Sequence, residues 1–437
     1  MKKVGVYVFT HMVKKRETKK RETFFDGQNY IGLRYILSEI DTTRYEITYV
    51  SKANVNTVDY LLVCLISYYD VFNLINELHG VKIKPKVIIG GPGCINVELF
   101  KDIADVAIIG RGENKIMHIL DDDERIDGLY YKDENYSLKK PLSVQPLEKF
   151  IEIGDNQIGR YIEQSIGCHR KCFFCEYSWK NKLKSKTDIY SSGLINRETR
   201  LEEVDWTIYK NKDLVTAIDG IDEATRRCIN KDISCETIKK KINEIYSQSK
   251  DYLSLKLYCL LGYPFQRDFK PEETLETIAG CSRNSNIRLN VVMVSPHFMP
   301  MPFTPMENEP VNQINFRDKI KAYDFSKYQT GNVKVYWPWA LASSPINAME
   351  ATVVHRAKVE DAELIKRILC SSKYKALQYR GKIAILNKAF EQYLGQYDDV
   401  LPYVKRTHPL DAAKRKYHQM VDELTKGGKH NAQSRPT

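Results

Sequence analysis

The sequence predicts an α/β protein that begins with a parallel sheet, continues into a second series of strands and helices, and ends in a helical region. Short apolar runs rich in Val, Ile and Tyr alternate with amphipathic stretches through residues 1–120, and the alternation resumes near residue 161. Such alternation indicates parallel strands with helices on both faces of the sheet. With 437 residues, the chain is long enough for two or three domains.

The first sheet offers candidate ligand-binding positions at the ends of its strands. The predicted strands are 4–10, 45–51, 59–67, 86–91 and 106–110, and the clearest helices between them are 30–40 and 70–80. In open parallel sheets, ligands bind beyond the carboxyl ends of the strands. The residues there are Gly90, Gly91, Gly110, Gly112 and Glu113. Glycine lets backbone approach a ligand closely, so these five are candidate cofactor-binding residues, with a tight turn as the alternative explanation.

Composition and charge limit the class of protein. The hydrophobic fraction of 43% and the charged fraction of 28% are typical of a soluble globular chain. The sequence contains neither an apolar run of about 20 residues nor the core of a signal peptide, so we expect a cytoplasmic protein without a membrane span and with reduced cysteines. The net charge of +11 gathers partly in 13–22, 169–186 and 404–437. These clusters indicate either a polyanion-binding surface or simply a solvated basic one.

The second half of the chain is expected to contain further strands followed by helices. After a connector at 121–160, the expected strands are 160–167, 214–219, 253–262 and 288–295. Between the second and third of them, a helical stretch at 222–248 is expected to break near Asp232. Beyond about residue 310 the chain becomes helical and basic, with the clearest amphipathic runs at 358–369 and 380–397.

The chemistry of the chain is most evident in the segment QSIGCHRKCFFCEYSWKNK, which holds Cys168, Cys172 and Cys175. A structural zinc site takes four ligands, whereas this loop offers three thiols, with Cys228 far away and His169 adjacent to a cysteine. Iron–sulfur clusters are held by thiolates at such short spacings. Three thiolates would leave one iron with an open position, which is what makes a metal centre reactive.

The spacing C-x-x-x-C-x-x-C after a predicted strand, with Phe174 directly before the last cysteine, resembles the cluster motif of the radical S-adenosylmethionine (SAM) superfamily. The resemblance implies that Cys168, Cys172 and Cys175 hold a 4Fe–4S cluster whose unique iron binds SAM. It further implies that one electron from the cluster cleaves SAM to a 5′-deoxyadenosyl radical, which abstracts a substrate hydrogen. The electron donor would be a flavodoxin or ferredoxin.

Other segments are similar to the branch of that family with an N-terminal cobalamin-binding-type domain. They include KPKVIIGGPGCINVELF, ADVAIIGRGE, LKLYCLLGYP and VVMVSPHFMPMPFTPME. The resemblance implies a Rossmann-like domain at 1–120, the connector at 121–160, a partial (βα)6-type radical SAM barrel at 161–310 and a mostly helical basic region at 311–437. It also nominates Phe174, Asp219, Arg227, Leu260, Gly262 and Pro264 as cofactor-binding residues; a surface ion pair is the alternative for Asp219 and Arg227.

Two departures from the family pattern affect these expectations. Only about forty residues separate Cys175 from the strand at 214, which leaves room for one abbreviated strand–helix unit and predicts a shortened, more open barrel. The N-terminal domain also lacks the D-x-H-x-x-G sequence whose histidine can ligate cobalt, since neither His11 nor His79 has that context. Cobalamin therefore stays an open option.

Three functional hypotheses follow. The first is a radical SAM enzyme that modifies a C–H position, by methylation or rearrangement, on a nucleic-acid base. The second is a radical SAM enzyme for a small metabolite or peptide, with the basic residues incidental. The third is a non-catalytic nucleic-acid-binding protein stabilised by a cluster, which would neither bind nor cleave SAM.

Overall fold

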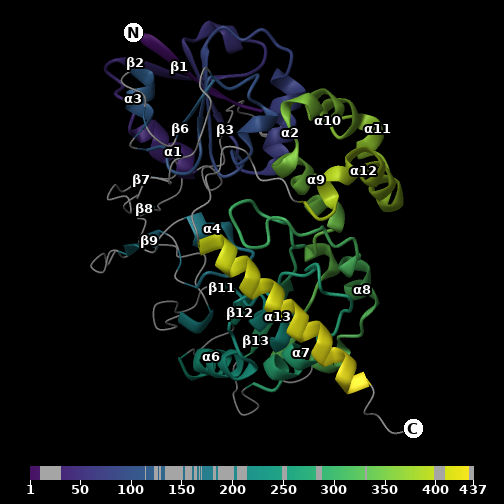
Figure 1. Ribbon diagram of the computed structural model, residues 1–437. Coiled ribbons are helices and arrows are strands. Elements are labelled where there is room, and N and C mark those ends of the chain that lie inside the picture. The colour runs from purple at the N-terminus through teal and green to yellow at the C-terminus, as the bar shows by residue number, and fades with distance from the viewer. Residues whose placement is uncertain are drawn as a thin grey trace.

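The computed structural model has an α/β architecture with two sheets and a C-terminal set of helices (Figure 1). The basic cluster at 13–22 and most of the connector lie outside the residues that the structure describes. The described residues are 1–9, 31–113, 115–122, 126, 129–132, 151–152, 160–161, 165–166, 168, 170–180, 184–185, 201–203, 214–248, 253–281, 288–329, 332–397 and 409–432.

The N-terminal sheet has six strands in the order β2-β1-β3-β4-β5-β6. Five of them are parallel and β6 runs antiparallel to β5. The strands are β1 Lys2–Tyr7, β2 Tyr45–Val50, β3 Tyr60–Cys64, β4 Lys86–Gly90, β5 Val106–Ile108 and β6 Leu129–Tyr131. β3 is buried along its first four residues, as the unbroken apolar run YLLVC predicts for a strand covered on both faces. This confirms the predicted parallel sheet.

Helices cover both faces of this sheet. On one face, α1 (Ile31–Ser38) and α3 (Ile116–Leu120) share an apolar core with the strands. On the other face, α2 (Tyr68–Leu78) packs into a separate core. α2 begins at a capping box in which the Asp70 carboxylate accepts the Ser67 amide at 2.9 Å, which satisfies amides at the helix start.

The C-terminal helices extend the core on the α2 face. They are α9 Pro345–Arg356, α10 Ala362–Ile368, α11 Ser372–Lys375 and α12 Tyr379–Leu394. α9 and α10 contact α2, and α9 also contacts α12; Figure 1 shows these helices beside α2. The Asn96 side-chain amide donates to the carbonyls of Val354 and Ala357 at 2.8 and 2.7 Å. Segments about 260 residues apart in the sequence therefore share one core.

The second sheet is parallel, with its four strands in chain order. Its strands are β11 Leu214–Ala217, β12 Leu253–Tyr258, β13 Leu289–Val294 and β14 Val333–Tyr336. The helices that follow these strands are α5 Glu223–Cys228 and α6 Cys235–Gln248, then α7 Glu272–Ala279 and α8 Phe316–Ala322. The break between α5 and α6 falls at Asp232, as predicted.

The predicted strand at 160–167 differs from expectation. Its ends form two short strands, β8 (Arg160–Tyr161) and β9 (Ser165–Ile166), which pair antiparallel with β7 (Ile151–Glu152) and β10 (Lys184–Ser185). Among the described residues, neither joins the parallel sheet. A buried parallel strand needs a continuous apolar run, and Glu163 and Gln164 interrupt this one.

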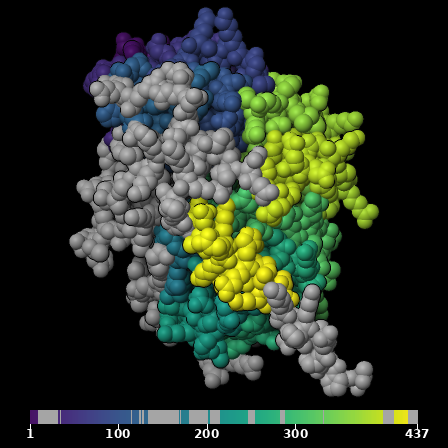
Figure 2. Space-filling view, in the orientation of Figure 1, coloured from purple at the N-terminus to yellow at the C-terminus, as the bar shows by residue number. Residues whose placement is uncertain are grey.

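In Figures 1 and 2 the last helix, α13 (Pro409–Ala432), runs across the front of the second sheet and its helices, and it contacts α5. The short helix α4 (Glu176–Lys180) directly follows Cys175. Tyr417 of α13 is 1% exposed and packs into an aromatic cluster below it. In the described part of the chain, no helix has both the length and the apolar character needed to span a membrane. Single 3-10 turns occur at Val55–Thr57, Val97–Leu99, Leu201–Glu203, Ser326–Tyr328, Trp339–Leu341 and Val359–Asp361.

Candidate metal centre at the cysteine loop

The three cysteines lie on one short loop that leads into α4. Cys168 and Cys172 are buried, and Cys175 is half-buried. The Cys175 amide donates to the Cys172 carbonyl at 3.1 Å, and the Trp179 indole N–H donates to the same carbonyl at 2.8 Å. The loop is therefore closed by backbone and indole bonds, and neither of these bonds involves a cysteine side chain.

The loop is attached to the turn that follows α5. The Phe173 amide donates to the Ile229 carbonyl at 3.0 Å. The Asn230 side-chain amide donates to the carbonyls of Arg170 and Lys171 at 3.2 and 3.0 Å. Asn230 and Lys171 both have positive φ, 55° and 54°. Such values are sparsely populated outside glycine, so hydrogen bonds are needed to hold the two turns together.

An aromatic cluster places the loop at the carboxyl end of the second sheet. Phe174 contacts Tyr263, which follows β12, with ring centroids 6.1 Å apart. Tyr263 also contacts Phe298, which follows β13. On the other side of the loop, Phe173 meets Tyr417 of α13 edge-on at 5.9 Å. The cysteines therefore lie at the sheet edge where parallel α/β proteins bind ligands, behind side chains that exclude water.

The number of thiols in the loop favours an iron–sulfur cluster over a single zinc ion. A structural zinc ion takes four ligands, whereas the motif offers three thiols within eight residues. Iron–sulfur clusters are held by thiolates at such short sequence spacings. Three thiols fit a cluster in which one iron keeps an open position.

Burial controls the protonation of these thiols. It raises the pKa of Cys172 to about 12 and also raises the pKa of Cys175. The neighbouring Lys231 ammonium opposes this effect at Cys172, and Asp219 adds to it at both residues. Both groups are therefore neutral thiols at neutral pH unless a metal binds them. Because metal ligation requires thiolates, loading this loop must release protons.

Of the two charged residues nominated beside the loop, the structure brings only Asp219 to it. Asp219 follows β11, has φ of 46°, and binds the Lys231 ammonium through Oδ2 at 2.5 Å. The side chains of this ion pair are only 15% and 11% exposed. Arg227 is two-thirds exposed and pairs with Glu223 on the surface of α5 at 3.5 Å.

Lys231 is the member of this site that the sequence did not reveal. It lies in the turn between α5 and α6, and no sequence motif surrounds it. The hydrogen bonds of the neighbouring Asn230 to the carbonyls of Arg170 and Lys171 hold its turn against the cysteine loop.

Of the three residues after β12 that were nominated as cofactor-binding, Gly262 has a packing role. Gly262 has φ of +80° and donates its amide to the Gln266 side chain at 2.8 Å. A Cβ at Gly262 would lie 2.3 Å from the His297 ring, so the close approach here serves His297. Leu260 joins the aromatic cluster. Pro264 lines a cavity of about 550 Å³ together with Arg267, Pro310, Val311, Asn312, Gln313 and Ile314.

His297 is expected to make the protein less stable in mild acid. Its ring is 3% exposed, and its Nε2 lies 2.7 Å from the Asn312 carbonyl. Burial lowers its pKa to about 4 from an ordinary value near 6.5. As pH falls below about 6.5, His297 becomes protonated in the unfolded chain but stays neutral in the folded chain. The free energy of unfolding therefore decreases until about pH 4. At about 1.4 kcal/mol per pKa unit, the loss is about 3 kcal/mol.

The measurement is urea unfolding of the wild type and of His297→Gln between pH 7 and 4. The wild type should lose about 3 kcal/mol more across this range than the variant does. Equal losses in both proteins would show that His297 is not the group responsible.

In the N-terminal sheet, two of the nominated glycines are explained by packing. Gly91, after β4, has φ of +103°, and a Cβ there would lie 2.4 Å from the Leu65 carbonyl oxygen. At Gly112 a Cβ would lie 2.9 Å from the Ile36 side chain. Gly90 has ordinary space around it, and Gly110 has φ of +93° with open space.

The acidic candidate after β5 is engaged in an ion pair. The Glu113 carboxylate lies 3.2 Å from Arg111 Nε. The nearby Lys115 is buried, and that burial lowers its pKa. Of the five nominated positions, Gly110 has open space in place of a packing contact.

Gly91 and Gly110 form a matched pair for testing the turn explanation. Both have positive φ, but only Gly91 also contacts backbone. We expect Gly110→Ala to lower the free energy of unfolding by about 1 kcal/mol, the cost of left-handed backbone alone. Gly91→Ala should cost at least about 2 kcal/mol more, because the Leu65 carbonyl accepts the Gly93 amide at 2.7 Å and cannot move freely. Equal costs in urea unfolding would contradict the steric explanation.

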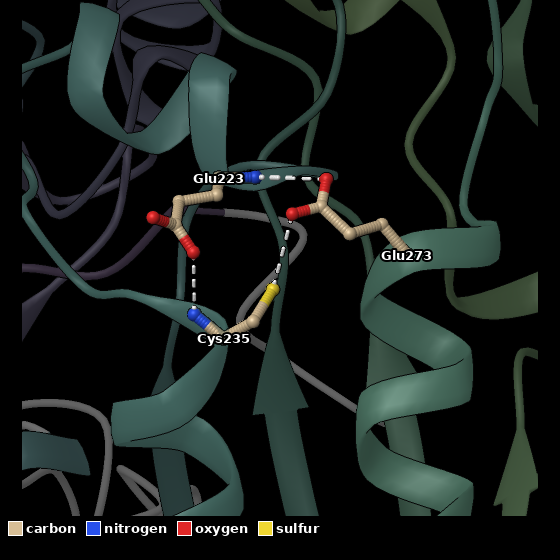
Figure 3. A group of neighbouring side chains, drawn as sticks. All are labelled: Glu223, Cys235 and Glu273. Atoms are coloured by element: carbon tan, nitrogen blue, oxygen red, sulfur yellow. Dashed lines mark hydrogen bonds between the residues drawn. The ribbon is translucent and has the colours of Figure 1, made fainter.

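A second cluster of metal-ligand types lies on the other side of α5. Glu223, Cys235 and Glu273 have one ligand atom each within 4.8 Å (Figure 3). The Cys235 amide donates to Glu223 at 2.8 Å, and its thiol donates to Glu273 at 3.3 Å. The buried Arg226 guanidinium lies 3.1 Å from the same sulfur. That fixed cation disfavours a metal ion, so the cluster ties together the starts of three helices.

Comparisons with known proteins come from structure alone. No protein-family model matches the chain, and no curated protein matches it. One similar structure is the radical SAM methyltransferase TsrM from Kitasatospora setae with cobalamin and a 4Fe–4S cluster bound. It is 12% identical with a TM-score of 0.31, and the match covers 82% of this chain and 67% of that chain.

Another is the cobalamin-dependent SAM radical enzyme OxsB with aqua-cobalamin and SAM bound, at 10% identity and a TM-score of 0.30. The match covers 98% of this chain but 62% of OxsB, so the chain spans about three fifths of that enzyme. Both belong to the class that the cysteine motif resembles.

Proposed function

We propose that the protein is a radical SAM enzyme that holds a 4Fe–4S cluster on Cys168, Cys172 and Cys175. The observation that supports it is the cysteine loop itself, which brings three thiols to the carboxyl end of a parallel sheet. When bound, such a cluster supplies the electron that cleaves SAM to methionine and a 5′-deoxyadenosyl radical.

The other residues of the site would bind SAM and keep water away. Oδ2 of Asp219 is occupied by Lys231, so a hydrogen bond from a SAM hydroxyl or amino group would fall to its Oδ1. Leu260 and Pro264 would contact the adenine, while the amide of Gly262 is already donated to Gln266. Phe174 and Tyr263 close the loop toward β12 and would shield the radical from water.

For the substrate we propose a nucleic-acid base. The chain carries a net charge of +11, and α13 brings cations to the loop. Lys416 donates to the Asn230 side chain at 3.0 Å and lies 5.9 Å from the Phe173 ring centroid. If such cations bind phosphates, the binding should weaken steeply with salt. A small metabolite or peptide is the alternative substrate, and a non-catalytic cluster protein is the alternative function.

The test is anaerobic reconstitution with iron and sulfide, followed by reduction in the presence of SAM. Formation of 5′-deoxyadenosine is the expected result. A cluster that forms but never cleaves SAM, with single-stranded RNA, DNA and cobalamin each added, would favour the non-catalytic alternative. Visible absorbance after incubation with cobalamin decides whether methyl transfer or a cobalamin-free modification is the reaction to seek.

A second measurement separates the substrate classes. Retention on immobilised RNA and DNA should fall steeply between 50 and 200 mM salt if phosphates are bound. No retention at low salt would contradict the nucleic-acid substrate and leave the radical SAM assignment untouched.

A further inference from the structure

A buried ion pair lies beneath the cysteine loop, on the two turns that flank α5. Lys231 Nζ lies 2.5 Å from Asp219 Oδ2, and Lys231 is 9% exposed as a whole residue. The turns are fixed by backbone bonds: the Lys231 amide donates to Arg226 at 2.9 Å, and the Asp219 carbonyl accepts the Tyr263 hydroxyl at 3.2 Å. These bonds fix the two turns, each of which carries one charge of the pair.

The pair is held next to the cysteines by the same turn that anchors their loop. Ile229 and Asn230, which directly precede Lys231, make three hydrogen bonds to the backbone of residues 170–173. The charges act on the sulfurs in opposite directions: Lys231 lowers the pKa of Cys172, whereas Asp219 raises it. Asp219 also acts on Cys175. The further charged groups here are Glu202, which acts on Lys231, and Arg170, paired with Glu202 at 3.1 Å.

Stability alone does not explain this pair. Removing two charges from water costs several kcal/mol per ion, and apolar side chains of similar size stabilise such sites as well or better. The Asp219 backbone adds strain through its positive φ. A buried, strained charge pair beside candidate metal ligands is therefore better explained by an electrostatic role.

We infer that Lys231 and Asp219 are a tuning pair that sets the reduction potential of the cluster, Lys231 raising it and Asp219 lowering it. The inference rests on the proposed function. A cluster on three thiolates becomes more negative when it takes up an electron, and this charge is screened little in a buried site. The fixed ammonium favours the reduced form, and the carboxylate opposes it. The pair positions charge and takes no part in bond breaking.

The experiment measures the midpoint potential of the reconstituted cluster, without SAM, in the wild type, Lys231→Met, Asp219→Asn and the double variant. At a fixed poise, Lys231→Met should lower the ratio of reduced to oxidised cluster about tenfold, a shift of about 59 mV for one electron. Asp219→Asn should shift the potential in the opposite direction. The double variant should return close to the wild type.

Opposite signs distinguish the electrostatic role from a structural one, because damage to the loop would move both single variants in the same direction. Lys231→Met leaves a buried carboxylate unpaired and is the variant most at risk of misfolding. The double variant avoids this, and comparing it with Asp219→Asn isolates the lysine charge: Asp219→Asn alone should have the higher potential. Lys231→Arg should restore the wild-type potential.

The control is Arg227→Met, which removes a cation four residues earlier that is exposed and should leave the potential unchanged. Equal potentials in all variants with intact iron and sulfide content, or shifts of the same sign, would overturn the inference. Failure of the wild type itself to assemble a cluster would instead overturn the proposed function.

Discussion

Replacing Cys172 by Ala is expected to abolish cluster assembly and every trace of SAM cleavage. Cys172 is the middle ligand of the proposed three, and its loss leaves two thiols that cannot hold a cubic cluster. The measurements are iron and sulfide content after anaerobic reconstitution, and 5′-deoxyadenosine after reduction with SAM. Both should fall to the level of a protein-free blank. The same result is expected for Cys168→Ala and Cys175→Ala.

The effect should be chemical and not structural. The bonds that close the loop at Cys172 come from its carbonyl, which Ala retains. Loss of one buried sulfur costs about 1 kcal/mol of packing, too little to unfold a chain of this size. A matched control is Cys281→Ala, another buried free cysteine, on the far side of the second core. It should assemble the cluster normally. An intact iron signal in Cys172→Ala would refute the assignment of the loop.

Local pattern was sufficient to predict most of the architecture. The strands β1 to β5 and the helices α1 and α2 were predicted because apolar periodicity directly reflects burial. The three cysteines were found because their spacing is local as well. The segment at 160–167 was predicted as one strand because its apolar residues alternate as in a strand. Its described residues instead pair in two short antiparallel ladders, and the two polar residues at 163–164 disfavour a place in the centre of a parallel sheet.

Features that depend on contacts between distant segments could not be predicted. The pair of Lys231 with Asp219 joins residues from two turns that lie twelve positions apart in the sequence. Arg227 was the more obvious cation because it lies on a clear helix, but the structure puts it on the surface. The shared core of α2 and α9 likewise depends on Asn96, whose two acceptors are about 260 residues away.

Replacing Arg356 by Met is expected to destabilise the folded chain by about 3–5 kcal/mol. Arg356 ends α9, is 4% exposed, and donates to four carbonyls. Its acceptors are Tyr393 at 2.6 Å, Gly395 at 3.2 Å, Glu307 at 2.8 Å and Glu309 at 2.9 Å. Burial lowers its pKa to about 10, so it remains a cation at neutral pH. Met fills much of the volume but leaves these carbonyls without a donor, and each buried one costs about 1–3 kcal/mol.

The measurement is urea unfolding, with Arg367→Met on α10 as the control. Arg367 is exposed, so its loss should change stability by less than about 0.5 kcal/mol. Equal midpoints and slopes for Arg356→Met and the wild type would contradict the prediction.

The consequence should extend to the cysteine loop, because the 307–309 turn that Arg356 holds also carries α13. Lys414 of α13 lies 3.0 Å from the Glu307 carboxylate, and His418 lies 3.9 Å from that of Glu309. Tyr417, the residue before His418 on the same helix, covers Phe173 beside Cys172. A loosened turn would release this helix and admit water to the loop. Arg356→Met should therefore lose its reconstituted cluster in air faster than Arg367→Met, even in conditions where both variants remain folded.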